Sequence, residues 1–358
     1  DDETSYEIQL GDYSTMDSER YVSIGDGNVY LVSNDPLDYF DIELSDMIDN
    51  DDIPSMDQVT QLQFSGSEDL QVTYEEDGTG TYRDDDVYFT QRDGESLPLD
   101  TSRVDSYLQT IRYLGLTDYV TYNATEEDLQ AYGLDNPDLT IQIDYTDEED
   151  DGTQTTGSFV LSISRDPTEK AAAEAEDSST DTAAESTGDT TGTEEEEITA
   201  YARVGESKIL YQLSSDDYTT LMEASYDSFR HKEVLPADFA NVAQIDISLD
   251  GEEYTITASG EGDERAYYYG DAELDISTLQ SALEDLEADS FTDEQPAQQE
   301  EISLTVQLDL ENNPVVQIDL YRYDGSFCLA VVDGEPVSLV ERSLVVDLVE
   351  AVNAIVLN

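Results

Sequence analysis

Apolar and polar residues alternate with a period of two along much of the chain, which predicts β-strands with one buried face. Residues 21–33, 201–214 and 328–340 share one strand–turn–strand pattern with Gly or Asp at the turn. An alternating strand precedes each hairpin, and a helix pattern follows each one. The sequence therefore predicts that one strand–helix unit is repeated along the chain.

The helix pattern after each hairpin has the i, i+3, i+4, i+7 spacing of a helix with one buried face. Asp35 and Pro36 are the expected N-cap and first helical residue of the first of these helices. The expected apolar stripes are Leu37, Phe40, Leu44 and Ile48, then Tyr218, Leu221, Met222, Ser225 and Phe229, then Leu344, Val345, Leu348, Val352 and Ile355.

A second set of strands also repeats, because residues 59–65 resemble residues 242–248 and two more strand patterns follow each of them. Helix patterns at 99–108 and 274–283 come next. Runs of hairpinned strands with helices between the runs predict an α+β fold. We expect repeated antiparallel-sheet modules, each of three to four hairpinned strands followed by a helix.

Three repeats of unequal length are expected. Residues 1–50 are interpreted as the C-terminal part of a first repeat, 51–232 as a second, complete repeat, and 233–358 as a third, shorter repeat. The complete repeat contains an acidic insert at about 166–197, which holds twelve acidic residues against one Lys and no aromatic residue. Such a segment buries too little apolar surface to offset its ordering entropy, so it is expected to be disordered.

The charge balance excludes several classes of partner. The 358 residues contain 87 Asp and Glu against 14 Lys and Arg, a formal net charge of −73. Nucleic acids and anionic lipids are bound through clustered Lys and Arg, so neither is expected as a direct partner. Apolar residues still make up 38% and follow regular patterns, so most of the chain is expected to fold. Adaptation to high salt is a further explanation of the acidity alone.

The sequence contains no run of about 18 apolar residues and no leader with a basic start and an apolar centre. The chain begins at Asp1 rather than at Met. We therefore expect a mature or truncated fragment whose targeting segment is missing.

The sequence offers little catalytic or metal-binding chemistry. Cys328 is the single Cys and His231 the single His, which excludes Cys-based zinc sites and His-pair sites. No G-x-S-x-G, H-E-x-x-H or Walker pattern occurs. The abundant neighbouring carboxylates are interpreted as solvated surface charge. We predict no enzyme activity, no catalytic residues and no metal ligands, and the binding residues stay unknown.

Residues 147–152 resemble a calcium loop, with acids at loop positions 1, 3 and 5 and Gly at position 6. Position 12 falls on Ser158, where an EF-hand requires a bidentate Glu, and the flanks have strand patterns. The interpretation is an acidic hairpin loop. Residues 84–86 and 49–52 are expected to bind cations only weakly. No cofactor is expected beyond diffuse, weak calcium binding.

Three further features have structural explanations. His231, beside Arg230 and Lys232, is expected to complement the dipole at the end of a helix over 216–229. Cys328 is expected to be a small buried residue in a strand. Two interpretations are open for a set of Tyr residues, either strand formers or a carbohydrate- or peptide-binding face: Tyr122, Tyr132, Tyr145, Tyr267, Tyr268 and Tyr269.

Residues 125–137 read Thr-Glu-Glu-Asp-Leu-Gln-Ala-Tyr-Gly-Leu-Asp-Asn-Pro, which predicts a short helix capped by Thr125 and ended by Gly133. This L-x-x-Y-G-L-D-x-P run, with the strands, hairpin and helix that follow it, resembles the bacterial domain-of-unknown-function family 4340 (DUF4340). The resemblance covers most of 53–232 and recurs weakly in 1–50 and 233–358. The last copy keeps Pro314 but lacks Tyr-Gly-Leu.

The resemblance implies an extracytoplasmic protein that one N-terminal helix, absent from this chain, holds at the cytoplasmic membrane. It also implies genes beside ABC-type export permeases and gliding-motility-like auxiliary proteins, and it implies no catalytic residues. The expected function is a non-enzymatic binding or scaffold module, accessory to an ABC-type export system, with a membrane transporter or another protein as partner. The alternative is a carboxylate-dependent hydrolase of cell-surface glycan, which needs two carboxyls roughly 5–10 Å apart in a cleft.

Overall fold

The computed structural model describes residues 7–16, 18–39, 47–92, 94–149, 151–180, 197–260, 265–311 and 313–357. The chain forms two compact units, Asp1–Asp52 and Ile53–Asn358. None of the helices in the described ranges is both long and apolar enough to cross a membrane.

The N-terminal unit, Asp1–Asp52, contains an antiparallel sheet in the order β1-β2-β3. Its elements are β1 (Gln9–Tyr13), β2 (Arg20–Ser23), β3 (Tyr30–Val32) and the 3-10 helix η1 (Pro36–Tyr39). Asp35 caps η1 by accepting from the Leu37 amide at 2.9 Å, and its other oxygen lies 2.6 Å from Arg20 Nη1. The helix start at Asp35 is thus confirmed. Phe40 and Leu44 of the predicted stripe lie outside the described residues, and the prediction is wrong for Ile48, which is not helical.

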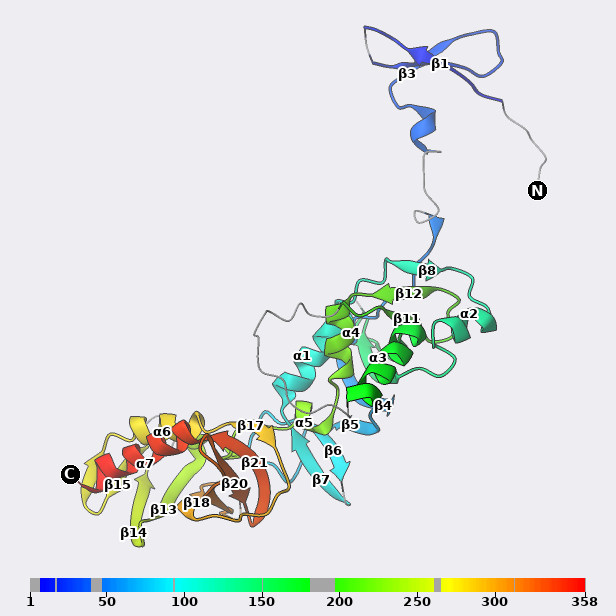
Figure 1. Ribbon diagram of the computed structural model, residues 1–358. Coiled ribbons are helices and arrows are strands. Elements are labelled where there is room, and N and C mark those ends of the chain that lie inside the picture. Colours follow the sequence, from blue (N-terminus) through cyan, green and yellow to red (C-terminus); the bar gives the residue numbers. More distant parts are fainter. Residues whose placement is uncertain are drawn as a thin grey trace. The chain divides into compact units, whose positions relative to one another are not determined.

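Residues 53–232 form what we call module A, with one sheet and helices between its runs of strands (Figure 1). The strands are β4 (Gln58–Gly66), β5 (Leu70–Tyr74), β6 (Tyr88–Arg92), β7 (Glu95–Leu99), β8 (Tyr119–Thr121), β9 (Leu139–Glu148), β10 (Gln154–Arg165), β11 (Ala200–Val204) and β12 (Leu210–Leu213). The helices are α1 (Thr101–Arg112), α2 (Glu126–Ala131), α3 (Pro167–Thr180), α4 (Ser215–Met222) and α5 (Tyr226–Phe229).

Residues 233–358 form module B. Its strands are β13 (Val242–Leu249), β14 (Glu252–Ser259), β15 (Ala266–Tyr269), β16 (Ala272–Leu274), β17 (Ala288–Phe291), β18 (Glu300–Leu308), β19 (Val315–Arg322), β20 (Phe327–Val332) and β21 (Glu335–Glu341). Its helices are the 3-10 helix η3 (Phe239–Asn241), α6 (Ser277–Glu284) and α7 (Arg342–Val356), and α6 and α7 lie side by side (Figure 1).

The two modules share one topology. Among the described residues, module A has a nine-stranded sheet in the order β7-β6-β5-β4-β9-β10-β11-β12-β8, and module B has a nine-stranded sheet in the order β16-β15-β14-β13-β18-β19-β20-β21-β17. Neighbouring strands are antiparallel. The predicted α+β fold of repeated antiparallel modules is therefore confirmed. Each sheet has more strands than predicted, because the outer strands are short and lack the alternation that marks a half-buried strand.

Each module has its own apolar core beneath its helices. The predicted stripe of α1 is buried at Val104, Leu108 and Ile111, as is that of α7 at Val345, Leu348 and Val352. Each such side chain contributes about 1.5–3 kcal/mol when fully buried. Cys328 is buried in β20, as predicted.

The predicted helix over 216–229 is interrupted. Helix α4 ends at Met222, and Ser225 starts α5 by accepting from the Ser228 amide at 3.0 Å. Because Ser225 has the extended backbone of an N-cap, it cannot continue a helix stripe. The apolar residues of the pattern still reach the core, with Leu221 and Phe229 buried.

The prediction that the whole acidic insert is disordered is wrong for residues 167–180, which form α3. Asp166 caps α3 by accepting from the amides of Thr168 at 2.8 Å and Glu169 at 3.2 Å. Pro167 has the backbone angle of a first helical residue, and the Ala residues that follow are strong helix formers. Residues 181–196 of the insert lie outside the described residues.

The predicted helix at 125–137 is confirmed as α2. Thr125 and Asp128 cap each other reciprocally at its start. At its end, Gly133 has a φ of 73°, and the amide of Leu134 donates to the carbonyl of Leu129 at 2.8 Å. This is a Schellman ending, in which Gly adopts a left-handed backbone and the next apolar residue folds back onto the helix. Leu134 is accordingly buried.

Candidate functional site

The segment from Arg230 to Asp238, which we call the linker, joins α5 of module A to module B and is hydrogen-bonded to both. At its module A end, the Arg230 amide donates to the Tyr226 carbonyl of α5 at 2.9 Å. At its module B end, the Ala288 amide donates to the Lys232 carbonyl at 2.7 Å. Charged side chains of module A therefore meet the linker at a fixed place.

His231 is in the linker, directly after the C-cap residue of α5. Its Nε2 lies 2.8 Å from Oδ1 of Asp86, a carboxylate that is only 4% exposed. Thr81 donates its hydroxyl to the other oxygen of Asp86. The helix end lies where it was expected, because α5 ends at Phe229 with Arg230 as its C-cap, but the partner that the structure gives the His231 ring is the Asp86 carboxylate.

Glu233 connects His231 to Arg83. Its Oε2 lies 3.7 Å from Nδ1 of His231, and its Oε1 lies 3.1 Å from Nη2 of Arg83. Arg83 also reaches Asp238, with 3.7 Å between Nη1 and Oδ1. Two cations and three carboxylates thus form one ion-pair network, which we call the linker cluster.

Burial and ion pairing shift the protonation of this cluster. Burial alone lowers the pKa of His231, but its contacts with Asp86 and Glu233 outweigh burial and raise that pKa to about 9. The His231 contact, against opposing burial, lowers the pKa of Glu233 to about 2. Burial raises the pKa of Asp238, although Arg83 opposes the rise. His231 is therefore a cation and Glu233 an anion at neutral pH.

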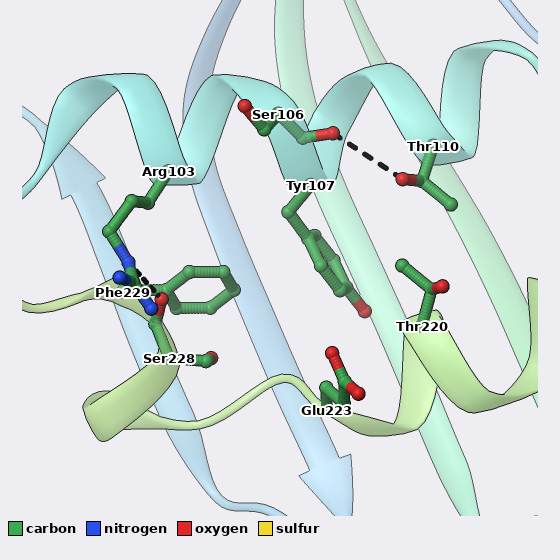
Figure 2. Close-up of a pocket in the computed structure, with 8 residues that line it drawn as sticks. All are labelled: Arg103, Ser106, Tyr107, Thr110, Thr220, Glu223, Ser228 and Phe229. Carbon is green, nitrogen blue, oxygen red and sulfur yellow. Dashed lines mark hydrogen bonds between the residues drawn. The ribbon is translucent and has the colours of Figure 1, made fainter. Parts of the chain in front are cut away.

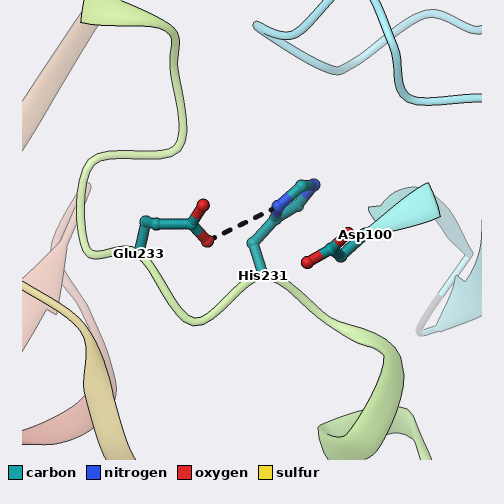
Figure 3. A group of neighbouring side chains, drawn as sticks. All are labelled: Asp100, His231 and Glu233. Atoms are coloured by element: carbon teal, nitrogen blue, oxygen red, sulfur yellow. Dashed lines mark ion pairs between the residues drawn. The ribbon is translucent and has the colours of Figure 1, made fainter. Parts of the chain in front are cut away.

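Asp100, at the start of α1, lies beside this cluster. One ligand atom each from Asp100, His231 and Glu233 lies within 4.8 Å of the others, and both carboxylates are turned toward His231 (Figure 3). Sequence reasoning missed this grouping, because Asp100 is far from the linker in the sequence. The sequence did contain one signal, a single His in a strongly acidic chain. From the sequence alone, this His is explained by Arg230, Lys232 and the preceding helix, and not by distant carboxylates.

Residues 84–86, expected to bind cations weakly as a group, have different environments. Asp84 and Asp85 are exposed, whereas Asp86 is buried against His231 and Thr81. The acidic run at 147–152 begins at the end of β9 and leads toward β10, as predicted for a hairpin loop, with the Glu149 amide donating to the Thr153 carbonyl at 2.9 Å, and Asp150 lies outside the described residues. Asp147 accepts from the Asp57 amide at 2.9 Å, so it holds a neighbouring segment in place.

The six Tyr residues singled out do not form a common face among the described residues. Three are in β15 of module B, where Tyr267 is buried. In module A, Tyr132 packs edge to face against Tyr201 with ring centroids 4.7 Å apart, and Tyr122 packs in the same way against Tyr119 at 6.2 Å. These contacts favour a structural role for Tyr122, Tyr132 and Tyr267.

A cavity of about 280 Å³ lies between α1 and the α4–α5 segment of module A (Figure 2). Its aromatic residues are Tyr107, whose hydroxyl donates to the Leu221 carbonyl at 2.9 Å, and Phe229. Arg103 donates through Nε to the Ser228 carbonyl at 2.6 Å. This volume lies near the lower limit for small-molecule sites, which run from about 300 Å³. Its aromatic wall and polar rim suit a small amphipathic group.

Module B has larger hollows whose linings include carboxylates. One of about 500 Å³ is lined by Arg265, Glu273 and Asp275, among others. Hydrogen bonds from Ser277 lower the pKa of Asp275, whereas a general acid needs a raised pKa. Asp275 therefore does not have the properties of a general acid. The glycan-hydrolase alternative therefore stays a prediction, with no support from this hollow.

Comparison with known proteins gives one family. The model described as "Domain of unknown function (DUF4340)" matches residues 1–137 and, in a second, overlapping match, residues 94–305. No curated protein and no solved structure matches the chain.

Proposed function

Because the chain belongs to the DUF4340 family, whose model matches more than half of its residues, we propose that it is a non-enzymatic binding and scaffold module. It works outside the cytoplasmic membrane as an accessory of an ABC-type export system. The family resemblance supports the location and the exporter partner. The repeated modules support the scaffold role, since stacked copies of one unit build extended binding surfaces.

The N-terminal unit carries the binding part of the proposal. Four apolar residues of its strands are each more than 40% exposed among the described residues: Tyr13, Tyr21, Tyr30 and Leu31. The segments beside these strands add Ile8, Met16, Ile24, Val29, Leu37 and Met47. Tyr30 pairs with Val22 as Tyr211 pairs with Ala202, yet Tyr30 is 43% exposed and Tyr211 is fully buried. So many exposed apolar side chains in one small unit mark a protein interaction surface.

The repeat indicates what covers this sheet. The strands that correspond to β1 are β10 and β19, which pair along their other edges with β9 and β18. We propose that β1 pairs in the same way with an antiparallel strand of alternating apolar residues. In this proposal the partner strand is one of the strands that complete the first module, and the full-length polypeptide carries them. Several modules in a row would then contact the exporter.

Co-purification tests the exporter partner. The full-length protein is co-expressed with the export permease encoded beside its gene, and the complex is isolated from membranes through a tag on the permease. We expect the protein to co-purify, and a matched permease from another system serves as control. A folded full-length protein that stays unbound, or a gene without any transporter beside it, would overturn the proposal.

Hydrogen exchange tests the strand layer separately. We expect the outward amides of β1 to exchange fast in the 358-residue chain and slowly in the full-length protein. Equal exchange rates in the two proteins would contradict the proposed first module. They would leave the exporter test unaffected.

A further inference from the structure

We infer that Asp100, His231 and Glu233 form a binding site for one divalent transition-metal ion, with zinc as the reference metal. This goes beyond the proposed function, which requires no metal. The set offers one imidazole nitrogen and two carboxylate oxygens within 4.8 Å of one another (Figure 3). Zinc accepts these ligands at about 2.0–2.2 Å, and three protein ligands leave a fourth position for water.

The orientation of His231 is that of a metal ligand. Nε2 is held by the buried Asp86, and Thr81 holds Asp86 in turn. Among the described residues, Nδ1 is buried without a hydrogen-bond partner and faces Glu233 at 3.7 Å. A metal-binding His typically donates its other ring N–H to a carboxylate, which leaves the lone pair on the ligating nitrogen. Asp86 is that carboxylate.

Each acidic ligand has one oxygen engaged and one available. Oδ1 of Asp100 caps α1 by accepting from the Ser102 amide at 2.9 Å, and no described residue donates to Oδ2. Oε1 of Glu233 pairs with Arg83, and Oε2 faces His231. Ligand atoms of a tetrahedral zinc site lie about 3.3–3.4 Å apart, given bonds of about 2.0–2.1 Å. Metal binding therefore requires the ligand atoms, which lie within 4.8 Å of one another, to move closer together.

The charge of the surroundings favours a cation. Four carboxylates, Asp86, Asp100, Glu233 and Asp238, stand against the two cations Arg83 and His231, which leaves 2 − 4 = −2 even with His231 protonated. A divalent ion that takes the place of the Nδ1 proton brings this balance to −1. Because Asp86 and His231 are largely buried, solvent ions screen the excess poorly.

The test is a zinc titration of the purified 358-residue chain, stripped with EDTA and placed in competition with a chromophoric chelator. Molar NaCl and millimolar MgCl2 are present to occupy the exposed carboxylates. We expect one saturable zinc per chain. His231→Ala removes it, and Asp86→Asn, which removes the carboxylate that orients His231 but no ligand, weakens it roughly 10–100-fold.

The matched control is Asp238→Asn, which removes the same charge from the cluster without removing a ligand, and it should keep the single site. Asp100→Asn keeps a good N-cap, so its loss of zinc is separable from misfolding. If circular dichroism shows that His231→Ala does not fold, the zinc affinities of Asp100→Asn and Glu233→Gln decide whether the site exists. Cobalt added in place of zinc should give a visible spectrum that these two variants lose. Absence of a saturable site, or a site that all variants and the control weaken equally, would overturn the inference.

Discussion

Gly66 and Asp138 lie so close together that a Cβ atom on Gly66 would stand 2.4 Å from the Asp138 carbonyl oxygen. Gly66 ends β4 with a φ of 118°, a backbone that other residues rarely adopt, and the next amide, of Ser67, donates to the same carbonyl at 2.7 Å. We expect Gly66→Ala to lower the free energy of unfolding by about 3 kcal/mol or more, from strain and backbone displacement together.

Gly94→Ala is the control for that variant. Gly94 also has a positive φ, of 88°, but a Cβ atom added there would meet nothing within 4 Å. The substitution should cost only about 1 kcal/mol, the strain of a left-handed residue. Chemical denaturation of both variants measures the difference, and equal costs would show that the contact with Asp138 is unimportant.

Tyr30 and Tyr211 occupy equivalent positions in two copies of one strand pair, but Tyr30 is exposed and Tyr211 is buried. Substituting each in turn tests whether the two copies differ in stability. Tyr211→Ser should destabilise module A by about 3–5 kcal/mol, as for other buried aromatic residues. Tyr30→Ser should change stability by less than about 0.5 kcal/mol in this chain, because Tyr30 is exposed. Urea unfolding of each variant checks both values. A large loss at Tyr30 would mean that the sheet is covered within this chain.

Among three consecutive acids, only Asp86 should matter for stability. Asp86→Ala leaves the charged, largely buried His231 without its hydrogen-bond partner, and removing one member of such a pair costs about 3–5 kcal/mol. Asp84→Ala, at an exposed position two residues earlier, should cost less than about 0.5 kcal/mol. Denaturation midpoints of the two variants provide the comparison. Similar midpoints would remove the linker cluster as a source of stability.

The thiol of Cys328 should be unreactive in the folded protein. Burial, reinforced by the nearby Glu301, raises the pKa of Cys328 to about 11, so little thiolate exists at pH 8. We expect a thiol reagent such as DTNB to modify Cys328 only after unfolding, at a rate that rises with denaturant. Stoichiometric modification of the native chain within seconds would contradict the buried position.

Salt should stabilise the whole chain, because a net charge of −73 repels itself and mobile cations screen that repulsion. At low ionic strength, added NaCl should raise the melting temperature, and CaCl2 should raise it more than MgCl2, since calcium accepts irregular carboxylate geometry. Calorimetry should find no saturable micromolar calcium site. A melting temperature that does not change with salt concentration would show that the acidic residues are paired or far apart.

The sequence was sufficient to predict the parts of the fold that depend on local periodicity. The stripe of α7 and the ending of α2 at Gly133 are examples, because each is set by neighbours within one or two helical turns. The short edge strands β8 and β17 escaped prediction, since their positions depend on pairing with β12 and β21 and not on their own pattern. Helix α3 escaped because composition was weighed above the cap at Asp166.

The linker cluster was beyond local reasoning for a related reason. Asp86 and His231 are separated by 145 positions, and no spacing rule connects a carboxylate in one loop to an imidazole in another. Only the folded chain brings Arg83, Asp86 and Glu233 around the one His. The acidic background made the search harder, because every His in such a chain has acids nearby in the sequence.

The position of β8 has a consequence for synthesis on the ribosome. β8 leaves the ribosome directly after α1, yet its partner is β12, whose Leu210 pairs with Thr121. Module A therefore cannot close its sheet until residue 213 has emerged, and module B waits in the same way for β21. Such long-range closure is slow, and unpaired strands are open to aggregation and proteolysis meanwhile. Nascent chains that stall before β12 should be recognised by holding chaperones, whereas chains that have released Phe229, the last core residue among the described residues of module A, should already be protease-resistant in that module.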